Sequence, residues 1–422
     1  MTAEVVVLNK SAVALAADST VTIGGNRKTY NTVNKVFTLS KHHPVGVMIY
    51  GNAELMGMPW ETTIKEFRRH LGESSFETLE EYATELIGFI ERSRMLFPEE
   101  SQRDFFRGWV QIYFRDVREQ ITADVKAATT AGRKVTASQI GEIVENRILK
   151  VLETLKSQPV LPGLGEDFAL SLEEQYAAEI ESALDIVFAH FPLTEESRLR
   201  LCQIATGLSI RLPGGVSGIV VAGFGESEPF PSVRAIACQS VVLNKLRYKF
   251  DDRSTKISFT NEGAVIPFAQ SDVVQSFVEG VDPDFRRIVD SYLGKFLEEF
   301  PGRIADQMAE EAREVTRQRL AEMSKQALDQ FRQRIERHVV EKHIRPLLDV
   351  IGFLPKDELA AMAEALVSLT SVKRKMSLEL ETVGGPVDLA VISKGDGFVW
   401  IKRKHYFDPK LNPHFFPKYF DR

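Results

Sequence analysis

The sequence predicts an α+β protein in which strands from the beginning, middle and end of the chain build one sheet system. Three observations carry this prediction. Residues 4–50 and 218–270 contain short stretches of alternating, often β-branched apolar residues, a pattern typical of strands. Residues 55–212 and 271–350 instead place apolar residues at helical spacing. The closing "GGPVDLAVISKGDGFVWIKRK" returns to strand, turn and strand, so the order is β, α, β, α, β, with helices covering or interrupting the sheets.

Composition narrows the class of protein. The chain has 422 residues, of which 44% are hydrophobic, enough for a sizeable core, and a net charge of −6. This charge argues against a nucleic-acid binder, which usually has a basic face. Only Cys202 and Cys238 occur, without metal spacing or a disulfide framework, which favours a reducing, cytoplasmic location. The sequence has no apolar run of transmembrane length and no signal-peptide pattern, so no membrane association is expected and the mature chain is expected to begin at or next to Met1.

The strand segments read as hairpins. In "EVVVLNKSAVALAAD" the Asn9-Lys10-Ser11 group is a turn between two strands, and a strand through Phe37 and then "VGVMIYG" continue what we expect to be one antiparallel meander. "GIVVAGFGESEPFPSVRAIAC" predicts a hairpin in the middle of the chain. "STKISFTNEGAVIPFAQ" is expected to extend the same sheet.

Two helical features are specific enough to test. Ser171 and Glu174 match a capping box and predict the start of a helix. The stretch 303–343 lacks Gly and Pro and predicts one helix of about 40 residues, about 60 Å long, that packs against a partner or another subunit. His338 and His343, five residues apart, are expected on different faces of this helix.

Several common catalytic motifs are absent from the sequence. It contains no GxxxxGK[ST] phosphate loop, no G-x-S-x-G elbow and no HExxH zinc motif. Neither a cofactor nor a metal ion is therefore expected.

One nucleophile requires no histidine. An N-terminal Thr carries a hydroxyl and an α-amine, and with a pKa near 8 the amine can act as base for its own hydroxyl. Thr2 lies behind Met1, whose removal is generally allowed before a small side chain.

Asp18 ends the strand that runs antiparallel to the one Thr2 begins, and we expect Lys35 on the adjacent strand. A Lys ammonium beside Thr2 would favour the alkoxide, Asp18 would hold that Lys, and the backbone N–H of Gly51 in "YGN" would form an oxyanion hole. Each residue alone also has a purely structural interpretation, as a common second residue, a strand terminator or a surface lysine.

These residues resemble those of the proteasome-type N-terminal nucleophile hydrolases, which include proteasome β subunits, the bacterial HslV-type peptidase and the Anbu-type relatives. Asp18 lies sixteen residues after Thr2, as in the family, and "AADSTVTIG" resembles the family's "AxDSRAT-x-G" box, with Thr20 where the family usually has Arg. "TVNKVF", "MIYGNAE" and "GGPVDLAVISKGDGF" are similar to the segments of the catalytic Lys, the oxyanion turn and the closing strands. "AQSDVVQSFVEGVDP" loosely resembles the family's "GSGxxxAxGxLD" helix start, which makes Ser271 a candidate supporting residue, and Asp357 in "LPKDELAAMAEAL" is a guess at the supporting acid.

The resemblance implies a four-layer αββα sandwich with large helical insertions. Its core would comprise 1–96, 201–282 and 351–404, with helical insertions at 97–200 and 283–350 and a tail at 405–422. The implied activity is that of a threonine peptidase which hydrolyses peptide bonds through an acyl-enzyme. The implied partners are a peptide or protein substrate, further copies of the chain, and an ATPase or other protein. A catalytically inactive scaffold subunit and an amidohydrolase of small substrates remain alternatives.

Overall fold

The computed structural model shows an α+β protein with two main antiparallel sheets, and describes residues 3–23, 28–30, 32–130, 136–189, 191–212, 217–307, 310–376 and 384–415. The first sheet has the order β13-β1-β2-β14-β15 and joins the start of the chain to its last strands. Its strands are β1 (Glu4–Asn9), β2 (Val13–Ala17), β13 (Gly263–Ala269), β14 (Asp388–Ser393) and β15 (Gly397–Lys402).

The second sheet has the order β11-β10-β9-β6-β5, with β12 paired to β10. Its strands are β5 (Val36–Thr38), β6 (Val45–Tyr50), β9 (Ser217–Gly223), β10 (Ser232–Val242), β11 (Lys245–Phe250) and β12 (Thr255–Lys256). The expected hairpin in the middle of the chain is confirmed, because β9 and β10 pair antiparallel. Two short pairs lie apart from the main sheets: β3 (Val21–Ile23) with β4 (Lys28–Tyr30), and β7 (Glu54–Leu55) with β8 (Met58–Pro59).

The expected strands thus occur, but some of them pair with other strands than expected. β1 and β2 belong to the first sheet and β5 and β6 to the second, so the early strands are not a single meander. β13 pairs with β1, so the segment after β12 does not extend the sheet of the central hairpin as expected. Alternation within each strand is the same for either sheet, and pairing partners far apart in the chain leave no local signal.

The two sheets lie face to face. Val6, Leu15 and Ala390 of the first sheet share a buried apolar cluster with Met48 and Val220 of the second. Gly46 on β6 allows this close approach, since a Cβ there would lie 2.7 Å from the side chains of Ile392 and Phe398. Alternate residues on each strand therefore face the space between the sheets.

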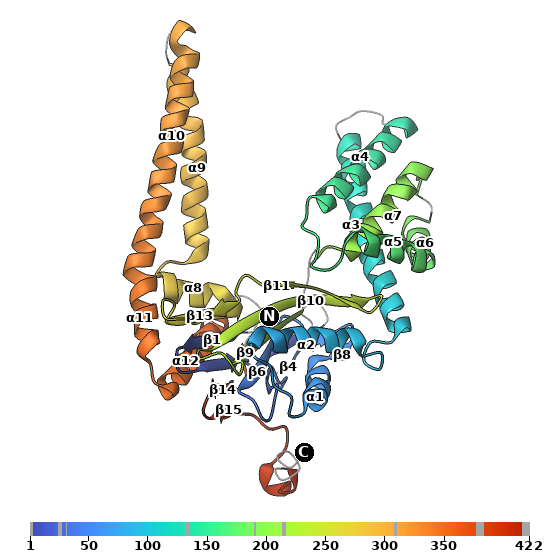
Figure 1. The fold of residues 1–422 in the computed structure, drawn as a ribbon. Helices are drawn as coiled ribbons and strands as arrows, with labels where there is room; N and C mark the ends of the chain where they lie inside the picture. Colours follow the sequence, from blue (N-terminus) through green and yellow to red (C-terminus); the bar gives the residue numbers. More distant parts are fainter. Residues whose placement is uncertain are drawn as a thin grey trace.

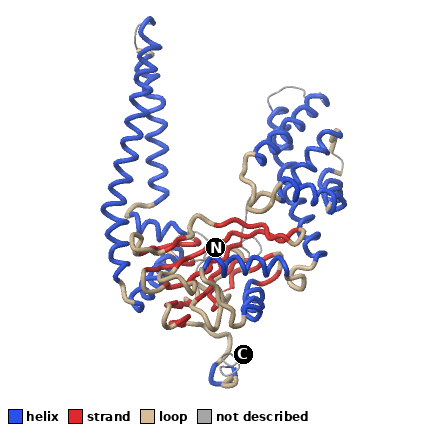
Figure 2. The backbone as a smooth tube through the Cα atoms, viewed as in Figure 1, coloured by secondary structure: helices blue, strands red, loops and turns tan. Residues whose placement is uncertain are grey.

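Helices cover the outer faces of both sheets. Helices α8 (Ser271–Glu279), α11 (Arg345–Phe353) and α12 (Lys356–Lys375) contribute to a buried cluster against the first sheet. Helices α1 (Trp60–Leu71) and α2 (Leu79–Arg92) do the same against the second. The strands accordingly form the central region in Figure 2, with helices around them.

A separate helical module follows α2 and has its own buried core. It consists of α3 (Glu99–Thr130), α4 (Ala137–Lys156), α5 (Glu166–Gln175), α6 (Ala177–Phe188) and α7 (Glu195–Ser209). Because α7 continues to Ser209 and packs into this core, the module extends past the expected boundary at residue 200. The expected capping box is wrong: Ser171 and Glu174 both lie inside α5. Capping boxes occur instead at Thr78 before α2 and at Thr136 before α4.

The other insertion is a helical hairpin, called here the arm. It consists of α9 (Pro283–Ala305) and α10 (Glu310–Val339), which lie side by side and project from the sheet region (Figure 1). The expected single helix over 303–343 is wrong, because α9 ends at Ala305 and its own chain supplies the packing partner. After α10 the chain forms a π-helical turn, η1 (Val340–Ile344), before α11.

The π-helical turn also corrects the expectation for the two arm histidines. The rings of His338 and His343 lie 5.9 Å apart, in an edge-to-face arrangement. A π-helix brings residues five apart onto one face, whereas an α-helix would separate them.

None of the described helices is long and apolar enough to cross a membrane. A short 3₁₀ turn, η2 (Pro409–Leu411), lies beyond the last strand.

Candidate active site

The candidate active site is built around a buried ion pair between Lys35 and Asp18. The Lys35 Nζ lies 2.5 Å from Asp18 Oδ1, and the two residues are only 2% and 1% exposed. Burying two charges is costly unless they are paired and hydrogen-bonded. Such a pair in the middle of an apolar core therefore needs further hydrogen bonds, which Asp18 receives from backbone groups.

The carboxylate of Asp18 binds three backbone N–H groups. Oδ1 accepts from Ala3 at 3.0 Å, and Oδ2 accepts from Gly384 at 3.0 Å and from Thr20 at 3.4 Å. The backbone N–H of Asp18 in turn donates to the carbonyl of Ala3 at 3.0 Å. Asp18 thus fixes the chain at Ala3, the residue that directly follows Thr2.

The register of the first two strands explains this geometry. β1 and β2 are antiparallel with Glu4 opposite Ala17, so the start of β1 meets the end of β2, as the sequence predicted. Thr2 itself lies outside the described residues. The hydroxyl of Thr20 donates to the carbonyl of Gly384 at 2.7 Å, so Thr20 is a hydrogen-bonded part of the same strand end.

Lys35 comes from the other sheet. It directly precedes β5, and its carbonyl accepts from the N–H of Ile49 on β6 at 2.9 Å. The expectation that Lys35 lies on a strand adjacent to that of Thr2 is therefore wrong. Its side chain reaches Asp18 across the space between the two sheets, and the ion pair joins the sheets.

Glu4 is a second carboxylate on the same lysine. Its Oε1 lies 3.2 Å from Lys35 Nζ, and its side chain is fully buried. Val6 and Leu8 of the same strand belong to the core between the sheets, and strand alternation places Glu4 on that face as well. The only signal for this residue in the sequence is an acid at the start of an otherwise apolar strand, "EVVVL".

A second buried ion pair lies nearby. Asp388, at the start of β14 and opposite Ala17, accepts from the backbone N–H of Lys404 at 2.9 Å and forms an ion pair with its ammonium. Burial lowers the pKa of Lys404; the Lys35 charge lowers it further, whereas Asp388 opposes the change. Sequence reasoning missed Asp388 and Lys404, because "PVDLAV" and the basic "KRK" each resemble ordinary strand ends.

The other predicted site residues differ in their placement. Gly51 follows β6 with φ 77°, in the left-handed region that favours glycine, at the sheet end where Lys35 precedes β5. Ser271 begins α8 two residues after Ala269, which pairs with Glu4, so it lies at the same end of the first sheet as Ala3. Asp357 is not brought to this site: it is exposed in the first turn of α12, next to Lys356, which contacts Ser393 at the far end of β14.

A polar network lies next to Gly51. Asp251 accepts from the Tyr50 hydroxyl at 3.1 Å and from Arg253 Nε at 2.8 Å. The Arg253 guanidinium lies 4.8 Å from the Tyr50 ring centre and 4.7 Å from that of Phe268. The hydrogen bond from Arg253 lowers the pKa of Asp251 to about 2, and burial raises the pKa of Tyr50. The turn that carries Gly51 is therefore anchored on one side.

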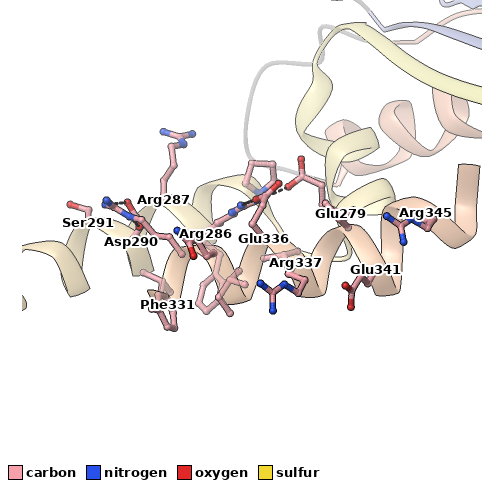
Figure 3. A pocket seen from close by; sticks show the side chains of 18 residues that line it. Glu279, Arg286, Arg287, Asp290, Ser291, Phe331, Glu336, Arg337, Glu341 and Arg345 are labelled. Atoms are coloured by element: carbon pink, nitrogen blue, oxygen red, sulfur yellow. Dashed lines mark hydrogen bonds and ion pairs between the residues drawn. The ribbon is translucent and has the colours of Figure 1, made fainter. Parts of the chain in front are cut away.

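A large hollow lies elsewhere, at the base of the arm. It has a volume of about 1380 Å³ and lies between α9 and α10 (Figure 3). Its charged groups largely neutralise one another: Arg286 pairs with Glu279 at 3.0 Å and with Glu336, and Arg332 pairs with Asp290 at 2.7 Å. None of the residues that line this hollow belongs to the cluster around Lys35. Within the described parts of the chain, no group of three or more His, Cys, Asp and Glu could hold a metal ion.

Comparison with known proteins assigns the chain to no family. No known family model matches the sequence, and no curated protein matches it at a significant level.

Proposed function

We propose that the chain is a threonine peptidase of the proteasome-type N-terminal nucleophile hydrolase family, with Thr2 as the nucleophile. The observation that carries the proposal is the buried Lys35–Asp18 pair with Asp18 hydrogen-bonded to the backbone of Ala3. This arrangement holds a cation next to the start of β1, where an N-terminal hydroxyl would need it. The proposal requires Thr2 to be the first residue of the mature chain.

The chemistry follows from an α-amine and a hydroxyl on one residue. The neutral amine of Thr2 takes the hydroxyl proton while the oxygen attacks the peptide carbonyl, and Lys35 stabilises the negative charge on the attacking oxygen. The Gly51 N–H donates to the carbonyl oxygen as it becomes an oxyanion. The protonated amine then gives its proton to the leaving amine, which leaves an ester on Thr2. Water, deprotonated by the same amine, hydrolyses that ester and regenerates the hydroxyl.

The fold that we propose for the core is the four-layer αββα sandwich of this family. Two facing antiparallel sheets with helices on their outer faces support it. In this proposal the module α3–α7 and the arm are insertions into the sandwich.

A non-catalytic scaffold subunit of the same fold is the second candidate. One observation favours it: α9 exposes large apolar residues, such as Tyr292 at 74%, on an arm that projects from the core. Such a surface is typical of assembly contacts.

Two measurements test the proposal. The first is the mass of the N-terminus of the purified protein, which must show Thr2 as the first residue. The second is labelling by a threonine-directed electrophile, with peptide hydrolysis measured in parallel. We expect Thr2→Ala to abolish both, and Lys35→Ala to reduce the labelling rate on the order of 10²–10⁴-fold.

Lys394→Ala is the matched lysine control, because Lys394 contacts the β9–β10 turn and not the site. An exposed Thr2 amine with no labelling in the wild type would favour the scaffold. A retained Met1 would exclude the proposed mechanism.

A further inference from the structure

The outer face of α9 carries a stripe of large apolar side chains. Across the described residues these side chains retain between 39% and 74% exposure. They recur every three or four residues over about 22 Å of helix, a spacing that keeps them on one face. The stripe comprises Phe285, Ile288, Tyr292, Phe296 and Phe300.

Beyond Phe285, which also lines the hollow between α9 and α10, this stripe is distinct from the surface that packs on α10. Pro301 and Ala305 are buried in the arm, and Val289 and Leu293 are partly covered, which places the α10 contact to one side of the stripe. The rings of Phe296 and Phe300 stack on each other at 5.4 Å. The stripe is therefore a second apolar surface of α9, beyond the one that holds the hairpin together.

Charged residues flank the stripe, with a negative charge near the start of the helix and a positive charge nearer its end. Asp284 lies at its beginning, where it also forms an exposed ion pair with Arg287, and Lys295 lies towards its end. Both Asp284 and Lys295 are exposed and on the same side of the stripe. When two antiparallel helices are related by a twofold axis, each flank of one helix lies beside the equivalent flank of the other helix. Asp284 of one copy would then meet Lys295 of the other, twice.

The apolar residues fit the same register. In a twofold antiparallel pair, two residues face each other when they lie equally far on either side of the twofold axis. An axis at position 290 satisfies this, to within half a residue, for three pairs: Asp284 with Lys295, Phe285 with Phe296, and Ile288 with Tyr292. One antiparallel alignment therefore brings all three pairs together at once.

The apolar area of the stripe supplies a large part of what a specific contact needs. Large apolar side chains bury ~150–250 Å² each when fully covered, so the exposed fractions of the stripe amount to roughly 500 Å² per copy. A stable interface buries about 800 Å² per partner, and the flanking residues Asp284, Ser291 and Lys295 add to the stripe.

We propose that α9 pairs with α9 of a second copy of the chain, antiparallel and centred near Asp290. The contact joins the two arms through their α9 helices. It does not depend on the peptidase proposal.

Cysteine cross-linking of the full chain tests the direction and register. In a Cys202→Ser background, with Cys238 buried, mixing Phe285→Cys chains with Phe296→Cys chains is expected to give a disulfide-linked dimer. Each variant alone is expected to give none, because like positions would lie about 16 Å apart along the helix axis. Gln326→Cys, exposed on α10, is the control for random collision.

Sedimentation of the full chain tests the contact itself. We expect Tyr292→Glu to weaken self-association at least tenfold, Asp284→Lys to weaken it several-fold, and Asp284→Lys with Lys295→Asp to restore it. All these side chains are exposed, so folding should be unchanged by circular dichroism. Cross-linking within the single variants, or equal masses for wild type and Tyr292→Glu, would overturn the proposal. Binding of lipid vesicles or of another protein by this face without self-association would overturn it too.

Discussion

At the residue scale, Glu4 is the feature that most distinguishes this site from a simple Thr-Asp-Lys arrangement. Lys35 lies between two buried carboxylates, at 2.5 Å from Asp18 and 3.2 Å from Glu4. The second carboxylate gives the lysine Nζ another anionic partner and fixes its position between the sheets. Under the peptidase proposal, Glu4 is two residues from the nucleophile, so its charge would act on the α-amine of a mature Thr2.

Replacing Glu4 with Gln is therefore expected to change the pH dependence of the proposed activity. A nearby carboxylate favours the charged ammonium and raises the pKa of the amine, so removing it lowers that pKa. The base is the neutral amine, and the rising limb of labelling rate against pH should move to lower pH. We expect maximal labelling to fall several-fold as well, since Lys35 loses one of its partners. An unchanged pH profile with reduced stability would instead assign Glu4 a purely structural role.

Asp251 provides a prediction about stability that does not depend on catalysis. Its folded-state pKa of about 2, set first by the hydrogen bond from Arg253, is lower than its ordinary value of 3.8. The unfolded state thus binds the proton more readily, and the stabilisation is complete above pH 4 and lost as the pH falls towards 2. Asp251→Asn should lower the free energy of unfolding by about 2 kcal/mol at pH 7. The difference from wild type in urea unfolding should shrink at pH 3, and a constant difference would contradict the assignment.

The sequence revealed the central site residues because their signals are local. An acid at the end of an apolar strand and a lysine within "VNKVF" can be found by inspection, and the structure brings Asp18 and Lys35 into contact. Asp388 and Lys404 could not be found in this way. Their placement depends on β14 pairing with β2, a contact between opposite ends of the chain.

At the element scale, Arg247 on β11 connects the helical module to the second sheet. Its guanidinium is fully buried and donates to the carbonyls of Ser209 at 2.7 Å, of Leu208 at 2.6 Å and of Arg211, at the C-terminal end of α7. It also lies 4.2 Å from the ring centre of Trp109 on α3. Burial lowers the pKa of this arginine to about 9, so it stays charged at neutral pH and complements the negative end of the α7 dipole.

Arg247→Met is expected to destabilise the docking of the module by about 3 kcal/mol or more, because it leaves buried carbonyls without donors at a cost of about 1–3 kcal/mol each. Arg247→Lys keeps the charge but has fewer donors, and should cost less. Hydrogen exchange of α3 and α7 measures the effect. Equal exchange in Arg247→Met and wild type would show that the module is held by its apolar contacts alone.

Element boundaries show where sequence patterns stop being informative. Apolar residues at helical spacing predicted helices over 55–212, and α1 and α2 lie in that range with the apolar face buried. This spacing did not separate α9 from α10, because polar residues continue through the connection without Gly or Pro after Gly302. In the π-helical turn His343 packs closely on Gly280, where a Cβ would lie 2.4 Å from the imidazole, a contact between distant segments that leaves no local pattern.

At the scale of the whole molecule, the arm is attached to the sheet region without being part of its buried core. The ion pairs of Arg286 with Glu279 and Glu336 bring the two ends of the arm together at its base. The buried cluster of the first sheet includes α11 and α12 but neither arm helix. Residues 284–338 are therefore expected to be removable without disturbing the sheets.

Replacing residues 284–338 with a linker of about six Gly and Ser residues should leave the core folded, since a short loop costs little to close once the ends are adjacent. We expect labelling of Thr2 within twofold of wild type, together with loss of the self-association that Tyr292→Glu weakens. Tyr292→Glu is the matched control, because it keeps the arm and changes only the stripe. Loss of labelling in the shortened chain but not in Tyr292→Glu would show that the arm stabilises the core directly, and that the two regions form one folding unit.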